Sequence, residues 1–174
     1  MADTSTCRLP QEGPAAWRPS DLAASEWTIV LDDDARVAIV TATRAALAAG
    51  ATVTSSRREQ FPLPTLTDQI SRWSRALADG RGFLLLRGFP IDLLDEHETE
   101  LAYIGLGHHL GRPVSQNSAG EVLTHIIDER LPADGPKVRL YRTNERQDFH
   151  TDGADIIGLL CLRRARAGGE SRIV

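Results

Sequence analysis

The spacing of apolar residues changes near residue 110, and this change limits the fold more than any other feature of the sequence. Before it, three stretches have the period of amphipathic helices: residues 35–49, 65–79 and 93–110. After it come three β-rich stretches separated by Pro, Gly and Asn turns: residues 122–128, 138–143 and 156–162. Helices followed by strands predict an α+β arrangement, with helices packed on a largely antiparallel β core.

Two short strands are also expected within the helical part. The first is WTIVL at residues 27–31, directly before an acidic run that can cap the helix after it. The second is GFLLLRGF at residues 82–89, which is strongly apolar and predicts a buried strand. Residues 1–25 have no clear period and predict a loosely ordered arm.

Composition limits the classes of partner. The formal net charge of -4 argues against a non-specific nucleic-acid binder, and no apolar run approaches the ~20 residues that span a membrane. Residues 1–11 have no apolar signal region, and a disulfide between Cys7 and Cys161 is not expected, so we expect a cytoplasmic protein. The oligomeric state stays open, a homo-oligomer included.

The apolar run at residues 171–174 follows a Gly-Gly turn, as if a strand began there. An unpaired strand would leave its ladder groups unsatisfied, so we expect the sequence to be a piece of a longer protein. On this view residues 26–174 are the N-terminal part of a single domain.

His150 and Asp152 are the main candidates for chemistry. In a strand, residues i and i+2 point to one face, so this imidazole and carboxylate can converge on a metal ion. One further histidine would complete the 2-His-1-carboxylate triad of non-haem Fe(II) oxygenases. His-x-Asp also arises by chance, as a polar pair at the exposed end of a strand. The polar stretch before it, and the apolar stretch and Gly-Gly turn after it, favour a metal site at the rim of a β-barrel.

Other polar residues have plainer interpretations. Adjacent His108 and His109 point about 100° apart on a helix, so they suit its C-terminal dipole better than one metal ion. His125 is expected to be a satisfied core or edge histidine, although it can also face a pocket. Three basic residues that alternate with apolar ones could flank a pocket for an acidic substrate: Lys137, Arg139 and Arg142.

Four sequence pieces carry a resemblance to a known family. They are Gly82 to Phe89, Leu110 to Pro113, His150 to Asp152, and Gly168 to Ser171. In this order they resemble the TauD/TfdA family of Fe(II)- and 2-oxoglutarate-dependent dioxygenases, which includes taurine dioxygenase and relatives of clavaminate synthase. The resemblance covers residues 80–174, and the ordered combination is more specific than any one piece.

The resemblance implies a double-stranded β-helix, a jelly-roll core with flanking helices. It implies that His150 and Asp152 are the first two Fe(II) ligands. Ser171 matches a position, usually Thr, whose hydroxyl helps to hold a 2-oxoglutarate carboxylate. Asn117 lies where such enzymes place a loop near the substrate pocket. The implied reaction uses Fe(II) and O2, oxidises a small organic substrate and converts 2-oxoglutarate to succinate.

The family pattern also contains a distal histidine ligand and an arginine that pairs with 2-oxoglutarate, both well beyond the Gly-Gly turn. Only three residues follow Ser171, so residues 1–174 alone are expected to lack a complete site and to be weak or inactive. Two alternatives stay open. One is a non-catalytic jelly-roll domain that binds a ligand or partner, and the other is a jelly-roll metal enzyme that does not use 2-oxoglutarate.

Overall fold

The computed structural model describes residues 12–130 and 140–173. Its longer helices are α2 (Asp33–Ala48), α3 (Thr67–Ala78) and α4 (Glu96–Gly107), and its strands are β1 (Thr28–Val30) and β2 (Leu85–Arg87). Short turns of helix complete it: α1 (Ala24–Trp27), and the 3-10 turns η1 (Pro19–Asp21), η2 (Arg58–Gln60), η3 (Pro64–Leu66) and η4 (Leu140–Arg142). All three predicted helices are therefore present, with ends within a few residues of those expected.

Local sequence signals explain where these helices begin. The Asp32 side chain accepts a hydrogen bond from the backbone N–H of Ala35 at 2.8 Å and caps α2. Asp95 caps α4 in the same way through Glu98, whose carboxylate accepts in return from the backbone N–H of Asp95. Gly50 ends the α2 turn with a φ of 77°, a left-handed conformation that suits glycine.

The core lies between α2, α3, α4 and the segment that joins α2 to α3. Phe61, in that joining segment, is fully buried, and its ring packs where a side chain on Gly105 of α4 would be. The predicted apolar face of α3 is confirmed at Ile70 and Trp73, which are both buried. The buried hydrophobic cluster comprises Leu31, Ala35, Ile39, Ala42, Ala46, Ala51, Phe61, Leu63, Leu66, Ile70, Trp73, Leu101, Ala102 and Leu106.

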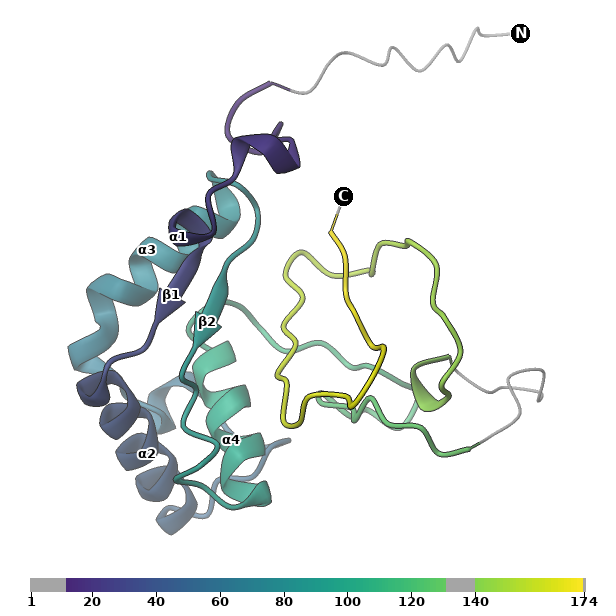
Figure 1. Ribbon diagram of the computed structural model, residues 1–174. Helices are drawn as coiled ribbons and strands as arrows, with labels where there is room; N and C mark the ends of the chain where they lie inside the picture. Colours follow the sequence, from purple (N-terminus) through teal and green to yellow (C-terminus); the bar gives the residue numbers. More distant parts are fainter. Residues whose placement is uncertain (1–11, 131–139, 174) are drawn as a thin grey trace, which may run out of the picture.

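The strands β1 and β2 pair in parallel, with Thr28 opposite Leu85 and Val30 opposite Arg87 (Figure 1). The largely antiparallel core was expected of the strands after residue 110, and the direction of this earlier pair was not predicted. The two strands are joined by a long crossover that contains α2 and α3, and such a connection returns the chain in the same direction. The predicted burial of β2 is wrong, because Leu85 is 37% exposed in a sheet that has two strands among the described residues.

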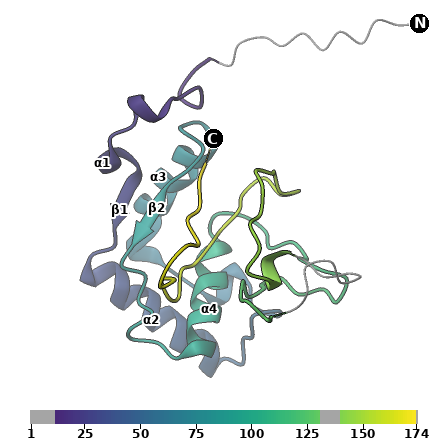
Figure 2. The same ribbon diagram turned by 45° about the vertical axis from the view of Figure 1, so that its right-hand side comes forward.

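The described residues after α4 contain no strand and only the short η4 turn. The strands predicted at 122–128 and 156–162 are irregular backbone, and 140–142 form a 3-10 turn, while 138 and 139 lie outside the described residues. Figures 1 and 2 show this part as loops beside α4. A strand needs a neighbour for its backbone groups, and no ladder partner is present for these segments within the described residues. Most of their large apolar side chains are consequently exposed, such as Ile126 at 64% and Leu159 at 69%, and Cys161 is a free, exposed thiol.

At the other end of the described chain, Trp17 attaches the first residues to the rest. Its indole N–H donates to the carbonyl oxygen of Arg81 at 3.0 Å. No helix within residues 12–130 and 140–173 has both the length and the apolar character needed to cross a membrane.

Candidate metal site

His150 and Asp152 lie next to each other in irregular backbone rather than at the end of a strand. The Nε2 atom of His150 is 3.9 Å from Oδ1 of Asp152, and the side chains are about half exposed, at 48% and 54%. The imidazole and the carboxylate therefore lie close together, although the strand that was expected to align them is not present.

A backbone carbonyl fixes which nitrogen of the His150 ring is free. Nδ1 is 2.8 Å from the carbonyl oxygen of Asp148, which can only accept, so Nδ1 carries a proton. In the neutral imidazole, Nε2 then holds a lone pair, and Nε2 is the nitrogen that lies near Asp152. This is the arrangement that orients metal-binding histidines in proteins, where the second ring nitrogen donates to a carbonyl or carboxylate.

The donor atoms of this pair fit a divalent transition metal. Imidazole nitrogen and carboxylate oxygen are ligands of iron, zinc and manganese. Two ligands at right angles with bonds of about 2.1 Å would be about 3.0 Å apart, so Nε2 and Oδ1 are about 0.9 Å too distant. Both side chains are half exposed, and little packing opposes a rotation that closes this gap. Among the described residues, no third His, Cys, Asp or Glu completes a three-ligand group with this pair.

The other two predicted site residues are not in hydrogen-bonding contact with the pair, as far as the described residues show. Ser171 is exposed and follows Gly168 and Gly169, which have φ of 74° and 73°, the left-handed values that glycine tolerates best. The Asn117 side chain is engaged within its own loop. Its Oδ1 accepts from the backbone N–H groups of Ala119 and Glu121, and its amide donates to the Glu121 carboxylate.

The paired histidines at the end of α4 go to separate partners, as their directions on a helix predict. The Nε2 of His108 is 3.1 Å from the hydroxyl of Ser56, and the Nε2 of His109 donates to the carbonyl of Phe61 at 2.7 Å. Burial lowers the pKa of His108 below its ordinary value, partly offset by its contact with Ser56. These two rings fasten the end of α4 to the segment that precedes α3.

His125, expected to be a satisfied core or edge histidine, does have a hydrogen-bond partner. It is exposed rather than in the core, and its Nε2 is 2.8 Å from a carboxylate oxygen of Glu100. Together with Glu96, these residues each offer one ligand atom within 4.8 Å of the other two. The i and i+4 spacing of the glutamates is visible in the sequence, but the approach of His125 depends on the tertiary fold.

The basic residues that were expected near an acidic substrate do not form a described pocket. Arg142 makes a two-point ion pair with the carboxylate of Glu129, so its charge is already matched. Lys137 and Arg139 lie outside the described residues.

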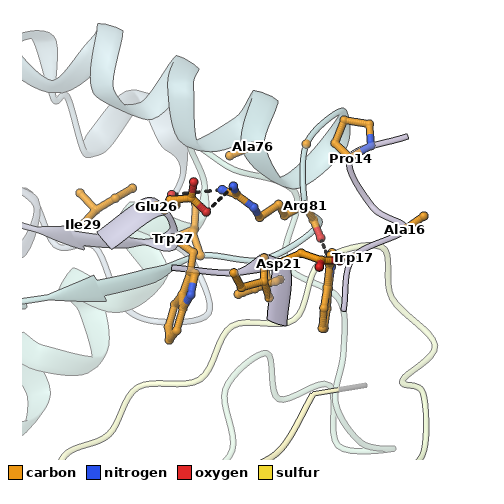
Figure 3. Close-up of a pocket in the computed structure, with 13 residues that line it drawn as sticks. Pro14, Ala16, Trp17, Asp21, Glu26, Trp27, Ile29, Ala76 and Arg81 are labelled. Carbon is orange, nitrogen blue, oxygen red and sulfur yellow. Dashed lines mark hydrogen bonds and ion pairs between the residues drawn. The ribbon is translucent and has the colours of Figure 1, made fainter. Parts of the chain in front are cut away.

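A cavity of about 520 Å³ lies elsewhere, between the N-terminal residues, α3 and the sheet (Figure 3). Trp17 and Trp27 both contact Phe83, with ring centroids 5.1 and 5.6 Å apart, and the Arg81–Glu26 ion pair lies beside them. Neither His150 nor Asp152 lines this cavity. The two tryptophan rings pack on Phe83, and nothing in this cavity connects it with the candidate metal ligands.

Comparison with known proteins gives a consistent result. The family model described as taurine catabolism dioxygenase TauD, TfdA family, matches residues 45–174, which include α3, α4, His150 and Asp152. FR-33289 synthase of Streptomyces rubellomurinus is 33% identical over 168 residues, which is 95% of this chain and 50% of that protein. Taurine hydroxylase-like protein SAT17 of Stachybotrys chartarum is 33% identical over 122 residues, 65% of this chain and 31% of that protein. The chain thus spans half or less of the length of these relatives.

Proposed function

The chain belongs to the TauD/TfdA family of dioxygenases, and we propose that it contributes two ligands to the iron site of an Fe(II)- and 2-oxoglutarate-dependent oxygenase. Its substrate would be a small organic molecule. The observation that supports this most is the orientation of the His150 ring, whose Nδ1 donates to the Asp148 carbonyl and whose free Nε2 lies 3.9 Å from the Asp152 carboxylate.

In this proposal each residue of the motif has a separate task. Nε2 of His150 and one carboxylate oxygen of Asp152 bind the metal, and the Asp148 carbonyl keeps the ring in the required tautomer and orientation. When bound, Fe(II) supplies the activation of O2, coupled to the conversion of 2-oxoglutarate to succinate. The Ser171 hydroxyl, placed after two left-handed glycines, donates a hydrogen bond to a carboxylate of 2-oxoglutarate.

Asn117 is proposed to act on the substrate side of this site. Its amide already makes three hydrogen bonds within residues 117–121, and direct contact with a substrate would break at least one of them. We therefore assign it the task of shaping the loop that borders the substrate, rather than that of a direct ligand.

The remaining roles of the family pattern are proposed to come from sequence outside residues 1–174. These are the distal histidine, the arginine that pairs with 2-oxoglutarate and the strands that complete a double-stranded β-helix. The chain spans 50% of the length of FR-33289 synthase, which leaves ample sequence in that relative for such groups.

A binding domain without catalysis is the second candidate. The observation in its favour is that His150 and Asp152 have no third ligand near them in the part of the chain that the structure describes. A domain with this pair alone would hold a metal weakly and would not hold 2-oxoglutarate on it.

The test is an anaerobic titration with Fe(II) and then 2-oxoglutarate, followed by the weak visible charge-transfer band of the chelate. We would measure this chain and, in parallel, the longest product of its gene. The proposal expects a band in the longer protein that is lost in His150→Ala and in Asp152→Ala. His97→Ala is the matched control, because His97 is an exposed histidine on α4 that belongs to no proposed site.

No band in the longer protein, or a band that survives His150→Ala, would overturn the proposal and favour the binding domain.

A further inference from the structure

We propose that Glu96, Glu100 and His125 form a second site, which binds a divalent transition-metal ion and fastens the segment around His125 to α4. The proposal is independent of the proposed oxygenase function, because it uses neither His150 nor Asp152 nor any other residue assigned to that function.

The site is built from two parts of the chain. Glu96 and Glu100 are four residues apart on α4, so their side chains lie on the same face, one turn apart. His125 comes from irregular backbone beyond the end of that helix, and its Nε2 reaches to 2.8 Å from Oε1 of Glu100. One ligand atom from each of the three residues lies within 4.8 Å of the other two.

The imidazole distinguishes this group from a patch of acidic side chains. Carboxylates alone suit Mg²⁺ and Ca²⁺ as well as any other cation, whereas an imidazole ligand favours zinc and its first-row neighbours. The His125 imidazole also comes from a segment outside α4, so its approach to the two glutamates does not result from their spacing on the helix. Among the described residues, the ion pair between Glu100 and His125 is the one salt bridge that either glutamate makes.

The distances allow the three groups to close on one ion. Ligands of tetrahedral zinc lie about 3.4 Å apart, so the widest pair would have to approach by at most about 1.4 Å. Glu100 and His125 are partly exposed, at 26% and 39%, and Glu96 is exposed, so side-chain rotation can supply this movement. A metal would take the position on Nε2 that a proton holds when His125 donates to Glu100, and that proton would be released. Three protein ligands would leave the fourth position to water.

We expect a bound ion to restrain the segment around His125. Leu101 and Ala102 of α4 are fully buried, so the helix is firmly fixed, whereas residues 122–130 contain no secondary structure. An ion shared between them would hold that segment against the helix, and binding to the folded form alone would raise the stability of the protein.

The experiment is a Zn²⁺ titration of the full chain by calorimetry, repeated with Co²⁺ to read the ligand field from its visible absorption. All titrations use the His150→Ala background, so that the proposed iron ligands do not contribute. We expect one site whose affinity falls about tenfold or more on adding His125→Ala or Glu100→Gln, while His97→Ala changes nothing. Proteolysis within residues 122–130 should slow with Zn²⁺ in the background protein but not in the His125→Ala variant.

Three results would overturn the proposal. Zn²⁺ affinity that is unchanged by His125→Ala would show that the imidazole is not a ligand. Loss of all Zn²⁺ binding in the His150→Ala background would place the ion at the other pair. Mg²⁺ binding as tight as that of Zn²⁺ would mark the group as an acidic patch that attracts any divalent cation.

Discussion

The described residues up to 110 and those after it both carry many large apolar side chains, but their structures are very different. Every residue of the buried hydrophobic cluster lies between Leu31 and Leu106. After residue 110, the described residues include no buried side chain, and large apolar groups such as Ile126 and Leu159 face outward. The difference follows from where the backbone finds its hydrogen bonds. A helix satisfies its own groups, whereas a strand depends on a neighbour.

The candidate chemistry lies in the second of these regions. His150 and Asp152 are held by local contacts, chiefly the hydrogen bond to the Asp148 carbonyl, and not by a packed core. Two contacts within the described residues join α4 to this second region: Glu100 pairs with His125, and the Tyr103 hydroxyl approaches Gly158. The helical region therefore acts as the support on which the site-bearing segment is placed.

The largest expected effect compares one phenylalanine from each region. Phe61→Ala should destabilise the protein by about 3–5 kcal/mol, because Phe61 is fully buried against α4. Phe149→Ala, at a side chain that is 61% exposed, should change stability by no more than about 0.5 kcal/mol. Urea unfolding of both variants measures this. A large loss at Phe149 would mean that the second region has a core of its own.

A pair of glycines on α4 should give smaller effects of opposite sign. A Cβ added at Gly105 would lie 2.3 Å from the Phe61 ring, and such overpacking costs about 1–3 kcal/mol, more than the gain of about 1 kcal/mol in helix propensity. Gly107 has no such neighbour within 4 Å, so Gly107→Ala should be neutral or mildly stabilising. Thermal unfolding compares them, and an equal response would contradict the close packing of Phe61 on α4.

The cap of α4 should contribute about 1 kcal/mol. Asp95→Ala removes the acceptor for the backbone N–H of Glu98, and loss of such a cap typically costs about 0.5–2 kcal/mol. Asp95→Asn keeps an acceptor and should restore most of that stability. Failure of Asn to do better than Ala in denaturant unfolding would show that the carboxylate acts by charge and not as a cap.

The smallest expected effect is a pH dependence from His108. Burial lowers the pKa of His108 below its ordinary value of 6.5, against a smaller opposing influence from Ser56 and Glu59, and His109 lowers it further. The unfolded chain therefore takes up the proton more readily, and stability should fall as pH drops below 6.5 through the folded pKa. His108→Gln should lose less stability between neutral and acidic pH than the wild type. A variant with an unchanged pH profile would show that this ring does not contribute.

The sequence predicts the helical region well, because caps, periodicity and the glycine at position 50 all act locally. It also predicts the positions of β1 and β2, but not their parallel pairing, which depends on a crossover of more than fifty residues. It fails for the stretches 122–128 and 156–162, whose β-rich composition expresses a preference that only a neighbouring strand can satisfy.

The candidate metal sites also differ in how far local sequence predicts them. The spacing of His150 and Asp152 predicts their convergence, because two side chains two residues apart need little help from the fold. The meeting of His125 with Glu96 and Glu100 depends on the path of the chain after α4, and no local pattern encodes it. Asn117 was expected to face a substrate, but its sequence context did not reveal that its amide would be occupied by its own loop.

Hydrogen exchange of the intact chain, followed by mass spectrometry of its peptides, tests the contrast between the two regions most directly. We predict slow exchange across α2, α3 and α4, and fast exchange across residues 122–128 and 156–162, whose amides have no ladder partner. Strong protection of those two stretches would contradict this account, because it would show that the strands indicated by their sequence do form in this chain.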